Sequence, residues 1–236
     1  MTVGATEVTK SGGAGFAGAG AGKVSAVVFD VGETLVDETR AWERVADACR
    51  VPRFTLMALV GAAIERGESH NRAFELLGVS RPFGAFQPGD LYPDALPCLR
   101  ALRERGLVVG AVGNMQEANE DVVRDHLDFV GSSERWGVEK PAPEFFERVV
   151  AEAGRPAAEI AYVGDRVDND VLPAKQAGMV AVHIRRGPWG VLHDASEADV
   201  QIESLEQLPA VLDGRRLDGA RQGAEVPAWP APERGS

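Results

Sequence analysis

The feature that most constrains this chain is an apolar run at residues 24–29, VSAVVF, which ends in the carboxylate of Asp30. A valine-rich run of this kind is typical of a strand that is buried on both faces of a parallel sheet. Asp30 then lies at the carboxyl end of the strand, where open α/β sheets bind their ligands. Because a buried carboxylate is costly without a partner, we expect a cation, hydrogen-bond donors or a metal ion to face Asp30.

The overall composition narrows the class of partner. The 25 Lys and Arg residues are outnumbered by 36 Asp and Glu residues, and the formal net charge is −11. An acidic chain repels nucleic-acid phosphates, and no stretch is long and apolar enough to span a bilayer. We therefore expect no nucleic-acid partner and no membrane partner. The two cysteines, Cys49 and Cys98, form no CxxC pattern, so we expect a cytoplasmic protein without disulfides or zinc.

The pattern of residues divides the chain into four parts. Residues 1–22 are rich in Gly, Ala, Ser and Thr and predict a flexible leader, and residues 213–236 predict a disordered tail. Residues 37–89 predict a small helical insert with helices at 38–50, 55–66 and 71–77. Residues 23–36 and 90–212 predict the core domain.

Strand and helix patterns alternate along the core. The predicted strands and helices are, in order: strand 24–29, helix 94–105, strand 107–112, helix 117–127, helix 143–153, strand 160–163, helix 169–177, strand 180–184, edge strand 200–202 and helix 205–212. Such alternation predicts an α/β fold with a doubly wound parallel sheet. Arg185 and Arg186 precede the sequence GPWG; they could help bind an anion, but we expect them in a solvated loop.

Polar groups follow several of these strands and can converge at one edge of the sheet. Asp30, Asp165 and Asp170 supply the carboxylate oxygens that Mg²⁺ prefers. Lys140, in the loop sequence GVEKP, is a candidate to hold an anionic nucleophile and a substrate phosphate. Asn114 can donate to a phosphate oxygen or shape a turn. Asp165, Asp168 and Asp170 also suit the start of the helix predicted at 169–177, and we assign the helix-capping role to Asp168.

These motifs, in this order, resemble the haloacid dehalogenase-like hydrolase superfamily over about residues 24–212. The matching stretches are FDVGETL at residues 29–35, GN at 113–114, GVEKP at 137–141 and VGDRVDND at 163–170, continuing to AGM at 177–179. The resemblance implies a Rossmann-like core with a helical cap inserted after the first motif, which is where the three helices are predicted.

The resemblance also implies roles for individual residues. Asp30 would be the nucleophile that forms an aspartyl-phosphate, and Lys140 would steady it. Asp165 and Asp170 would hold Mg²⁺ together with Asp30. A further set would contact the substrate: Thr34, Gly113 and Asn114.

Two positions depart from the family pattern. Phosphatases of this family usually carry a second aspartate two residues after the nucleophile, and Gly32 stands there. Loss of a positioned acid or base typically costs ~10²–10⁴-fold in rate, so we expect slow turnover. Glu33 is adjacent, but successive side chains point to different sides, which makes it a poor substitute. Gly113 stands where a Ser or Thr usually binds the phosphate.

Three functions fit these residues. The first is a Mg²⁺-dependent phosphatase that acts on a small phosphorylated metabolite. The second is a 2-haloacid dehalogenase, which uses the same kind of nucleophile without a metal, although the paired Asp165 and Asp170 count against it. The third is a degenerate member that only binds a ligand, which Gly32 and Gly113 favour. The oligomeric state and the identity of the substrate stay open.

Overall fold

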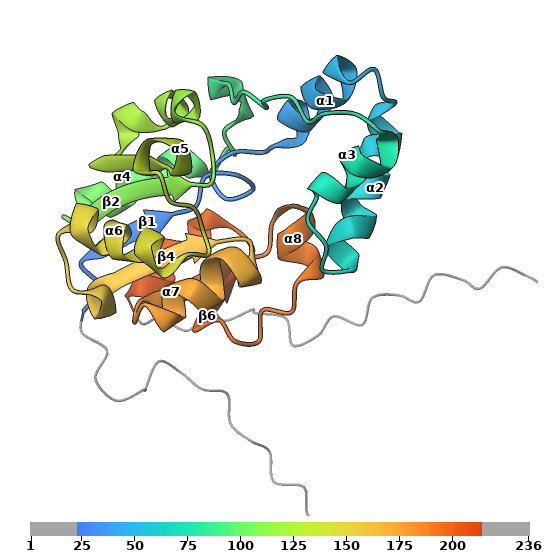
Figure 1. The fold of residues 1–236 in the computed structure, drawn as a ribbon. Coiled ribbons are helices and arrows are strands. Elements are labelled where there is room, and N and C mark those ends of the chain that lie inside the picture. The colour runs from blue at the N-terminus through green and yellow to red at the C-terminus, as the bar shows by residue number, and fades with distance from the viewer. Residues whose placement is uncertain (1–22, 214–236) are drawn as a thin grey trace, which may run out of the picture.

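A computed structural model describes residues 23–213. Its centre is a six-stranded, all-parallel sheet in the order β3-β2-β1-β4-β5-β6 (Figure 1). The strands are β1 (Ala26–Phe29), β2 (Val108–Gly113), β3 (Phe129–Ser132), β4 (Ile160–Gly164), β5 (Val180–Ile184) and β6 (Val200–Ile202). The predicted doubly wound α/β class is therefore confirmed. The predicted leader at 1–22 and the tail beyond residue 213 lie outside the described residues.

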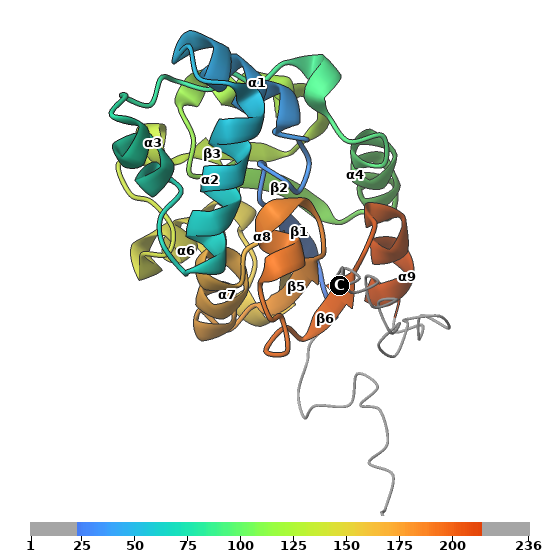
Figure 2. The ribbon, with the colours of Figure 1, turned by 90° about the vertical axis from the view of Figure 1, so that its right-hand side faces the viewer.

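Both faces of the sheet are buried, as the unbroken apolar pattern of β1 requires. Val27 and Phe29 pack in one cluster with α4 (Ala95–Glu104) and α9 (Leu208–Leu212). Ala26 and Val28 pack in a second cluster with α6 (Pro143–Ala153) and α7 (Leu172–Gln176). Figure 2 shows these two helix pairs on opposite sides of the strands. Each large side chain buried in this way contributes about 1.5–3 kcal/mol.

The strand order reverses between β1 and β4, which creates the crevice in which open α/β sheets bind ligands. Phe29, the last residue of β1, pairs in register with Val163 of β4 and Ala111 of β2. Asp30 follows Phe29 and its N–H donates to the Val163 carbonyl at 2.8 Å. The topology therefore places Asp30 at the mouth of this crevice.

Three helices lie between β1 and α4: α1 (Thr39–Ala48), α2 (Arg53–Glu65) and α3 (Asn71–Leu77). They build a hydrophobic cluster of their own, which Trp189 of α8 (Gly187–Leu192) joins from the core. Figure 1 shows α8 between the sheet and these helices. The helices lie where the sequence predicted them, and the division into a core and a cap at residues 37–89 stays a prediction.

Several short elements complete the fold. They are η1 (Pro88–Asp90), η2 (Glu117–Val122), η3 (Arg124–His126), α5 (Ser133–Trp136), η4 (Ala157–Glu159), the π-helical turn η5 (Val167–Val171) and η6 (Leu205–Gln207). None of the helices between residues 23 and 213 has the length and apolarity that a membrane crossing needs.

The segment 117–127 differs from the prediction of one α-helix, because it forms the two 3-10 segments η2 and η3. Glu120 is fully buried and ion pairs with Arg124 at 2.8 Å and with Arg135 at 2.9 Å. A buried ion pair, rather than an apolar helix face, thus sets the path of this segment. The predicted helix at 169–177 begins as the wider, π-helical turn η5 before α7. The predicted helix at 205–212 begins as the tighter, 3-10 turn η6 before α9.

Candidate active site

Four charged side chains meet at the carboxyl edge of the central strands. Asp30 directly follows β1, and Asp165 directly follows the neighbouring strand β4. Asp170 belongs to η5, and Lys140 lies in the loop before α6. One carboxylate oxygen from each of the three aspartates lies within 4.8 Å of the other two. The sheet topology thus brings together residues that are far apart in the sequence.

Lys140 lies between two of the carboxylates. Its Nζ donates to Oδ1 of Asp30 and to Oδ1 of Asp170, each at 2.6 Å. The lysine side chain is only 2% exposed, so water screens these two ion pairs little. The Tyr162 hydroxyl donates to the same Asp170 oxygen at 3.4 Å. The nucleophile candidate is therefore fixed to a buried cation.

Asn114 holds the backbone of Lys140. Its Nδ2 donates to the Lys140 carbonyl at 2.8 Å, and the Lys140 N–H donates to Asn114 Oδ1 at 2.7 Å. This reciprocal pair links the end of β2 to the loop that carries the lysine. It leaves one N–H of the Asn114 amide for a ligand, so the predicted contact with a phosphate oxygen stays a prediction.

The cluster shifts the ionisation of its members, as is typical of functional sites. Burial raises the pKa of Asp30 to about 6, while the ammonium of Lys140 opposes this rise and the Asp170 carboxylate adds to it. Burial, with the charges of Asp170 and Asp30, raises the pKa of Asp165 well above its ordinary value. Burial disfavours the charge of Lys140, but the two carboxylates hold its pKa well above the usual range.

The donor set fits a divalent cation. Three carboxylates face a single lysine, so the cluster carries a surplus of acid. Oδ2 of Asp165 is buried and accepts no hydrogen bond from any residue in the part of the chain that the structure describes. An unpartnered buried carboxylate oxygen is unfavourable unless a ligand binds it, and carboxylate oxygens are what Mg²⁺ prefers. The predicted metal ligands Asp30, Asp165 and Asp170 are therefore suitably placed for it.

Asp168 does not cap the following helix, contrary to the prediction. Its carboxylate accepts from the guanidinium of Arg166 at 2.6 and 3.1 Å. The Arg166 N–H, at the start of η5, donates instead to Asp170 Oδ2 at 3.1 Å. The exposed acid thus pairs with a nearby cation, and the buried acid binds the backbone.

The loop after β1 carries two further predicted candidates. Glu33 adopts a φ of 51°, and both of its carboxylate oxygens are engaged, with the Tyr92 hydroxyl at 2.7 Å and the Glu38 N–H at 3.2 Å. Thr34 is fully buried and is not among the residues that line the cavity above Asp30. Its predicted contact with substrate stays a prediction.

Gly113 ends β2 beside the nucleophile candidate. A Cβ atom at this position would lie 3.6 Å from Asp30 Oδ1 and 3.4 Å from Met115 Sδ, which are ordinary contact distances. Gly113 therefore borders both Asp30 and the cavity, and it leaves room beside the carboxylate.

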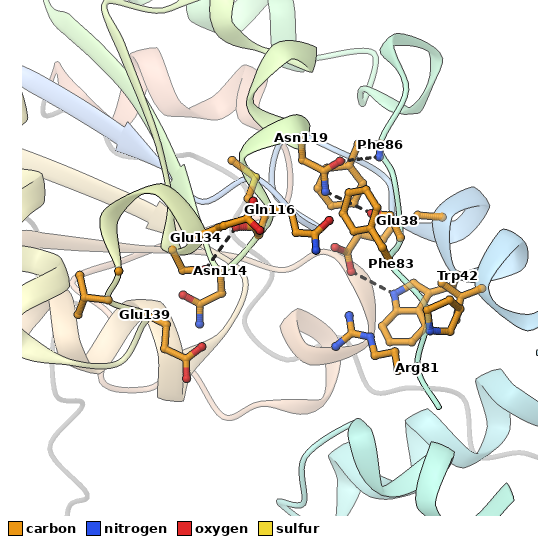
Figure 3. Close-up of a pocket in the computed structure, with 18 residues that line it drawn as sticks. Glu38, Trp42, Arg81, Phe83, Phe86, Asn114, Gln116, Asn119, Glu134 and Glu139 are labelled. Atoms are coloured by element: carbon orange, nitrogen blue, oxygen red, sulfur yellow. Dashed lines mark hydrogen bonds between the residues drawn. The ribbon is translucent and has the colours of Figure 1, made fainter. Parts of the chain in front are cut away.

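The site opens into a cavity of about 370 Å³ whose walls come from the core and from the helical insert. A second cavity of about 740 Å³ shares Glu38, Trp42 and Arg81 with the first. Figure 3 shows these three side chains facing Asn114 and Glu139 across the second cavity. A ligand on Asp30 thus meets side chains of the insert.

Glu38 and Arg81 are residues of the cavity wall that the sequence did not single out. Arg81 lies over the ring of Trp42, with its Cζ 5.2 Å from the ring centroid, and it contacts His70. No carboxylate of residues 23–213 lies within ion-pair distance of Arg81. Neither residue belongs to a motif, so no local signal marks it.

Comparisons with known proteins identify the family and agree with the fold. The family described as haloacid dehalogenase-like hydrolase matches residues 24–178. A glyceraldehyde 3-phosphate phosphatase from Methanopyrus kandleri is 32% identical over 232 residues, which covers 80% of this chain and 96% of the relative.

Two solved structures share the fold. A HAD phosphatase from Thermococcus onnurineus has a TM-score of 0.58 at 23% identity and covers 82% of this chain and 100% of that chain. A 2-haloacid dehalogenase from Pseudomonas syringae pv. Tomato has a TM-score of 0.56 at 23% identity and covers 80% of this chain and 98% of that chain.

The chain belongs to the haloacid dehalogenase-like hydrolase family, because the family match covers more than half of its residues. The predicted family and the predicted hydrolase class are thus confirmed. The roles assigned to individual site residues stay predictions.

Proposed function

We propose that this chain is a Mg²⁺-dependent phosphatase that acts on a small phosphorylated metabolite through an aspartyl-phosphate on Asp30. The observation that carries the proposal is the buried cluster in which one lysine serves three carboxylates and one carboxylate oxygen has no partner. A phosphatase needs a nucleophile, a fixed cation and a place for a divalent metal, and the cluster offers all three. The relative from Methanopyrus kandleri, named for glyceraldehyde 3-phosphate, supports the class of substrate.

Each residue of the cluster has a chemical role in this proposal. The Asp30 carboxylate attacks phosphorus and forms the covalent intermediate, while Lys140 orients it and offsets charge on the phosphoryl group. Asp30, Asp165 and Asp170 would hold Mg²⁺, whose charge offsets that of the phosphoryl oxygens. The Gly113 N–H, the free Asn114 N–H and Thr34 are the proposed contacts for the substrate.

The size of the cavity supports a small substrate. The cavity above Asp30 measures about 370 Å³, at the lower end of the range for small-molecule sites. Residues of the helical insert form part of its wall, so a substrate on Asp30 meets the insert as well as the core.

Phosphate release from a panel of small phosphate esters tests the proposal. The panel contains glyceraldehyde 3-phosphate, and the matched control is Asp30→Asn, which keeps the shape of the side chain and removes the nucleophile. We expect Mg²⁺-dependent phosphate release by the wild type and none by Asp30→Asn. Equal release by both proteins, or none by the wild type at high enzyme concentration, would overturn the proposal.

A calorimetric titration with Mg²⁺ tests the metal site separately. We expect binding to the wild type and no binding to Asp165→Asn, because the substitution replaces the carboxylate that has the unpartnered oxygen. Equal Mg²⁺ affinity in the two proteins would exclude Asp165 as a ligand.

The dehalogenase alternative has a distinct outcome in the same assays. It also uses Asp30 as nucleophile, but it gives no reason for the surplus of acid around Asp165 and Asp170. Halide release from 2-haloacids that persists in EDTA would favour the dehalogenase over the phosphatase.

We also propose a cytoplasmic location. Cys49 and Cys98 are free thiols, and Cys98 is buried. Free thiols without disulfides suit a reducing compartment.

A further inference from the structure

The carboxylate of Glu38 occupies the space in front of Gly32. A Cβ atom at Gly32 would lie 2.5 Å from Glu38 Oε1 and 3.0 Å from Glu38 Cδ. Any side chain at position 32 would therefore project into the place that this carboxylate fills. Glu38 immediately precedes α1 and lines the same cavity as Asp30. An acid thus lines the cavity above the nucleophile although position 32 carries none.

The Glu38 carboxylate is held on one side and open on the other. Its Oε2 accepts from Trp42 Nε1 at 3.1 Å, as Figure 3 shows. Trp42 is fixed in turn by stacking on Phe74, with ring centroids 6.3 Å apart and an interplanar angle of 25°. The Glu38 N–H donates to Glu33 at 3.2 Å. No residue within 23–213 donates a hydrogen bond to Glu38 Oε1, which leaves this oxygen for a ligand in the cavity.

The charges around Glu38 suit proton transfer near neutral pH. Burial raises the pKa of Glu38 to about 7, and the carboxylates of Glu33 and Asp30 add to the rise. The hydrogen bond from Trp42 and the guanidinium of Arg81 oppose it. An acid whose pKa lies near the working pH can both release and accept a proton.

The other titratable groups near Gly32 are poorly suited to this task. Both oxygens of Glu33 accept hydrogen bonds from within the protein. Burial, with the charge of Arg81, lowers the pKa of His70 to about 4, so this ring is uncharged at neutral pH and is a poor proton donor. Glu139 lies across the second cavity from Glu38 (Figure 3) and is exposed to solvent.

We propose that Glu38 is the general acid and base of the phosphatase reaction, a role that rests on the proposed function. When Asp30 attacks phosphorus, the bond from phosphorus to the leaving oxygen breaks, and that oxygen takes the proton of the Glu38 carboxyl group. The products of this step are the alcohol, the aspartyl-phosphate and the Glu38 carboxylate. The carboxylate then takes a proton from water, whose oxygen attacks phosphorus. The bond from phosphorus to Asp30 breaks, which releases inorganic phosphate and leaves Glu38 protonated again.

Two substrates separate the acid step from the base step in Glu38→Gln. The variant is nearly isosteric and can still accept from Trp42. On glycerol 3-phosphate, whose alkoxide needs a proton to leave, we expect kcat to fall ~10²–10⁴-fold. On p-nitrophenyl phosphate, whose phenolate leaves without a proton, we expect a burst of about one product per enzyme and then slow turnover, because the aspartyl-phosphate accumulates.

The matched control is Glu43→Gln. Glu43 lies on α1, is half-buried like Glu38 and pairs with Arg53 at 3.0 Å outside the two cavities. We expect wild-type rates and no burst. Wild-type rates in Glu38→Gln, or an equal loss on both substrates without a burst, would overturn the role of Glu38. Neither result would affect the proposed function, which fails if the wild type releases no phosphate or if Asp30→Asn releases as much as the wild type.

Moving the carboxylate provides a second test that does not depend on one variant. In Gly32→Asp alone, the new side chain meets the Glu38 carboxylate, so we expect reduced activity. In the double variant Gly32→Asp with Glu38→Ala, the acid returns to position 32, and we expect a rate above that of Glu38→Ala by tenfold or more. A double variant no faster than Glu38→Ala would count against a shared place for the two acids.

Discussion

Two of the ion-pair clusters within residues 23–213 are balanced in opposite ways. In the first, Arg186 and Asp94 are each only 11% exposed. Both oxygens of Asp94 accept from the Arg186 guanidinium, and one also accepts from the Ser204 hydroxyl at 2.9 Å and from the Leu205 N–H at 3.0 Å. This cluster is fully paired.

The second cluster is the candidate active site, where one lysine serves three carboxylates and Asp165 Oδ2 has no partner among residues 23–213. Buried carboxylates without enough positive charge destabilise the folded state, so this cluster is not explained by a purely structural role. In the Arg186 cluster every Asp94 oxygen therefore has a partner within the protein, whereas the Lys140 cluster has a carboxylate oxygen that is still able to bind a ligand.

The Arg186 cluster also corrects a prediction. Arg185 and Arg186 were expected in a solvated loop. Both lie in the loop between β5 and α8 and Arg185 is exposed as expected, but the Arg186 side chain is only 11% exposed because it pairs with Asp94. Arg186 stacks over the ring of Tyr92, with its Cζ 4.1 Å from the centroid, and donates to the Thr34 carbonyl at 3.0 Å. It therefore stabilises the loop that follows the nucleophile without facing substrate.

The largest expected effect comes from Lys140→Met. The change leaves Asp30 and Asp170 buried without their cation, so we expect loss of phosphate release and a decrease of about 3–5 kcal/mol in the free energy of unfolding. Urea unfolding and the phosphate assay measure the two effects. Lys175→Met is the control, because Lys175 is a surface lysine whose pair with Asp199, at 3.6 Å, contributes little. A stable, active Lys140→Met would show that the cluster does not depend on its lysine.

Asp94→Ala breaks the paired cluster instead. It leaves Arg186 buried without a counter-charge, and we again expect a loss of about 3–5 kcal/mol in the free energy of unfolding. Because Asp94 faces neither cavity, we expect the rate per folded molecule to stay near that of the wild type at low temperature. A large loss of rate without a loss of stability would contradict the separation of the two clusters.

Asp165→Asn should increase the free energy of unfolding, in contrast to the two preceding variants. In metal-free buffer it removes a buried carboxylate with an unpartnered oxygen, so we expect a gain of about 1–3 kcal/mol in the free energy of unfolding. Thermal unfolding in EDTA measures it. A destabilised Asp165→Asn would mean that the carboxylate is satisfied without a ligand.

Gly113→Ser adds a hydrogen-bond donor beside Asp30 in the Lys140 cluster. The Cβ atom fits at ordinary contact distances, and the hydroxyl would lie near Asp30. One added hydrogen bond to a charged phosphate is worth about 1.5 kcal/mol, so we expect KM for phosphate esters to fall about tenfold. An unchanged KM in a folded variant would show that phosphate does not approach position 113.

The two clusters should also differ in how pH changes their contribution to stability. The pairing with Arg186 holds the pKa of Asp94 below its ordinary value of 3.8, although burial opposes the shift, so its stabilisation is complete above that value and is lost as pH falls. Burial raises the pKa of Asp165, so its unfavourable effect grows as pH rises above 3.8. We therefore expect the gain in stability of Asp165→Asn over the wild type to be larger at pH 7 than at pH 4. We expect the loss of stability of Asp94→Asn relative to the wild type to become smaller as pH falls below 3.8. Parallel pH curves for both variants would contradict these assignments.

Local sequence signals were sufficient for much of the fold. The apolar run of β1, the stop at Asp30 and the alternation of strands and helices each depend on neighbouring residues, and the sheet was predicted from them. The family was recognised from its resemblance in the short motifs around Asp30, Lys140 and Asp165. The segment 117–127 was predicted wrongly, because the pairing of Glu120 with Arg135 depends on contacts that the local pattern does not contain.

The sequence by itself determined that Asp30 ends a buried strand and that position 32 has no acid. Only the tertiary structure decided that Lys140 also binds Asp170, that Arg186 is buried against Asp94, and that Glu38 fills the space in front of Gly32. The physical reason is that the direction of a side chain depends on the backbone path of its loop and on the elements packed against it. Glu38 lies outside every motif, and its position depends on α1 and on the stacking of Trp42 in the cluster of the helical insert.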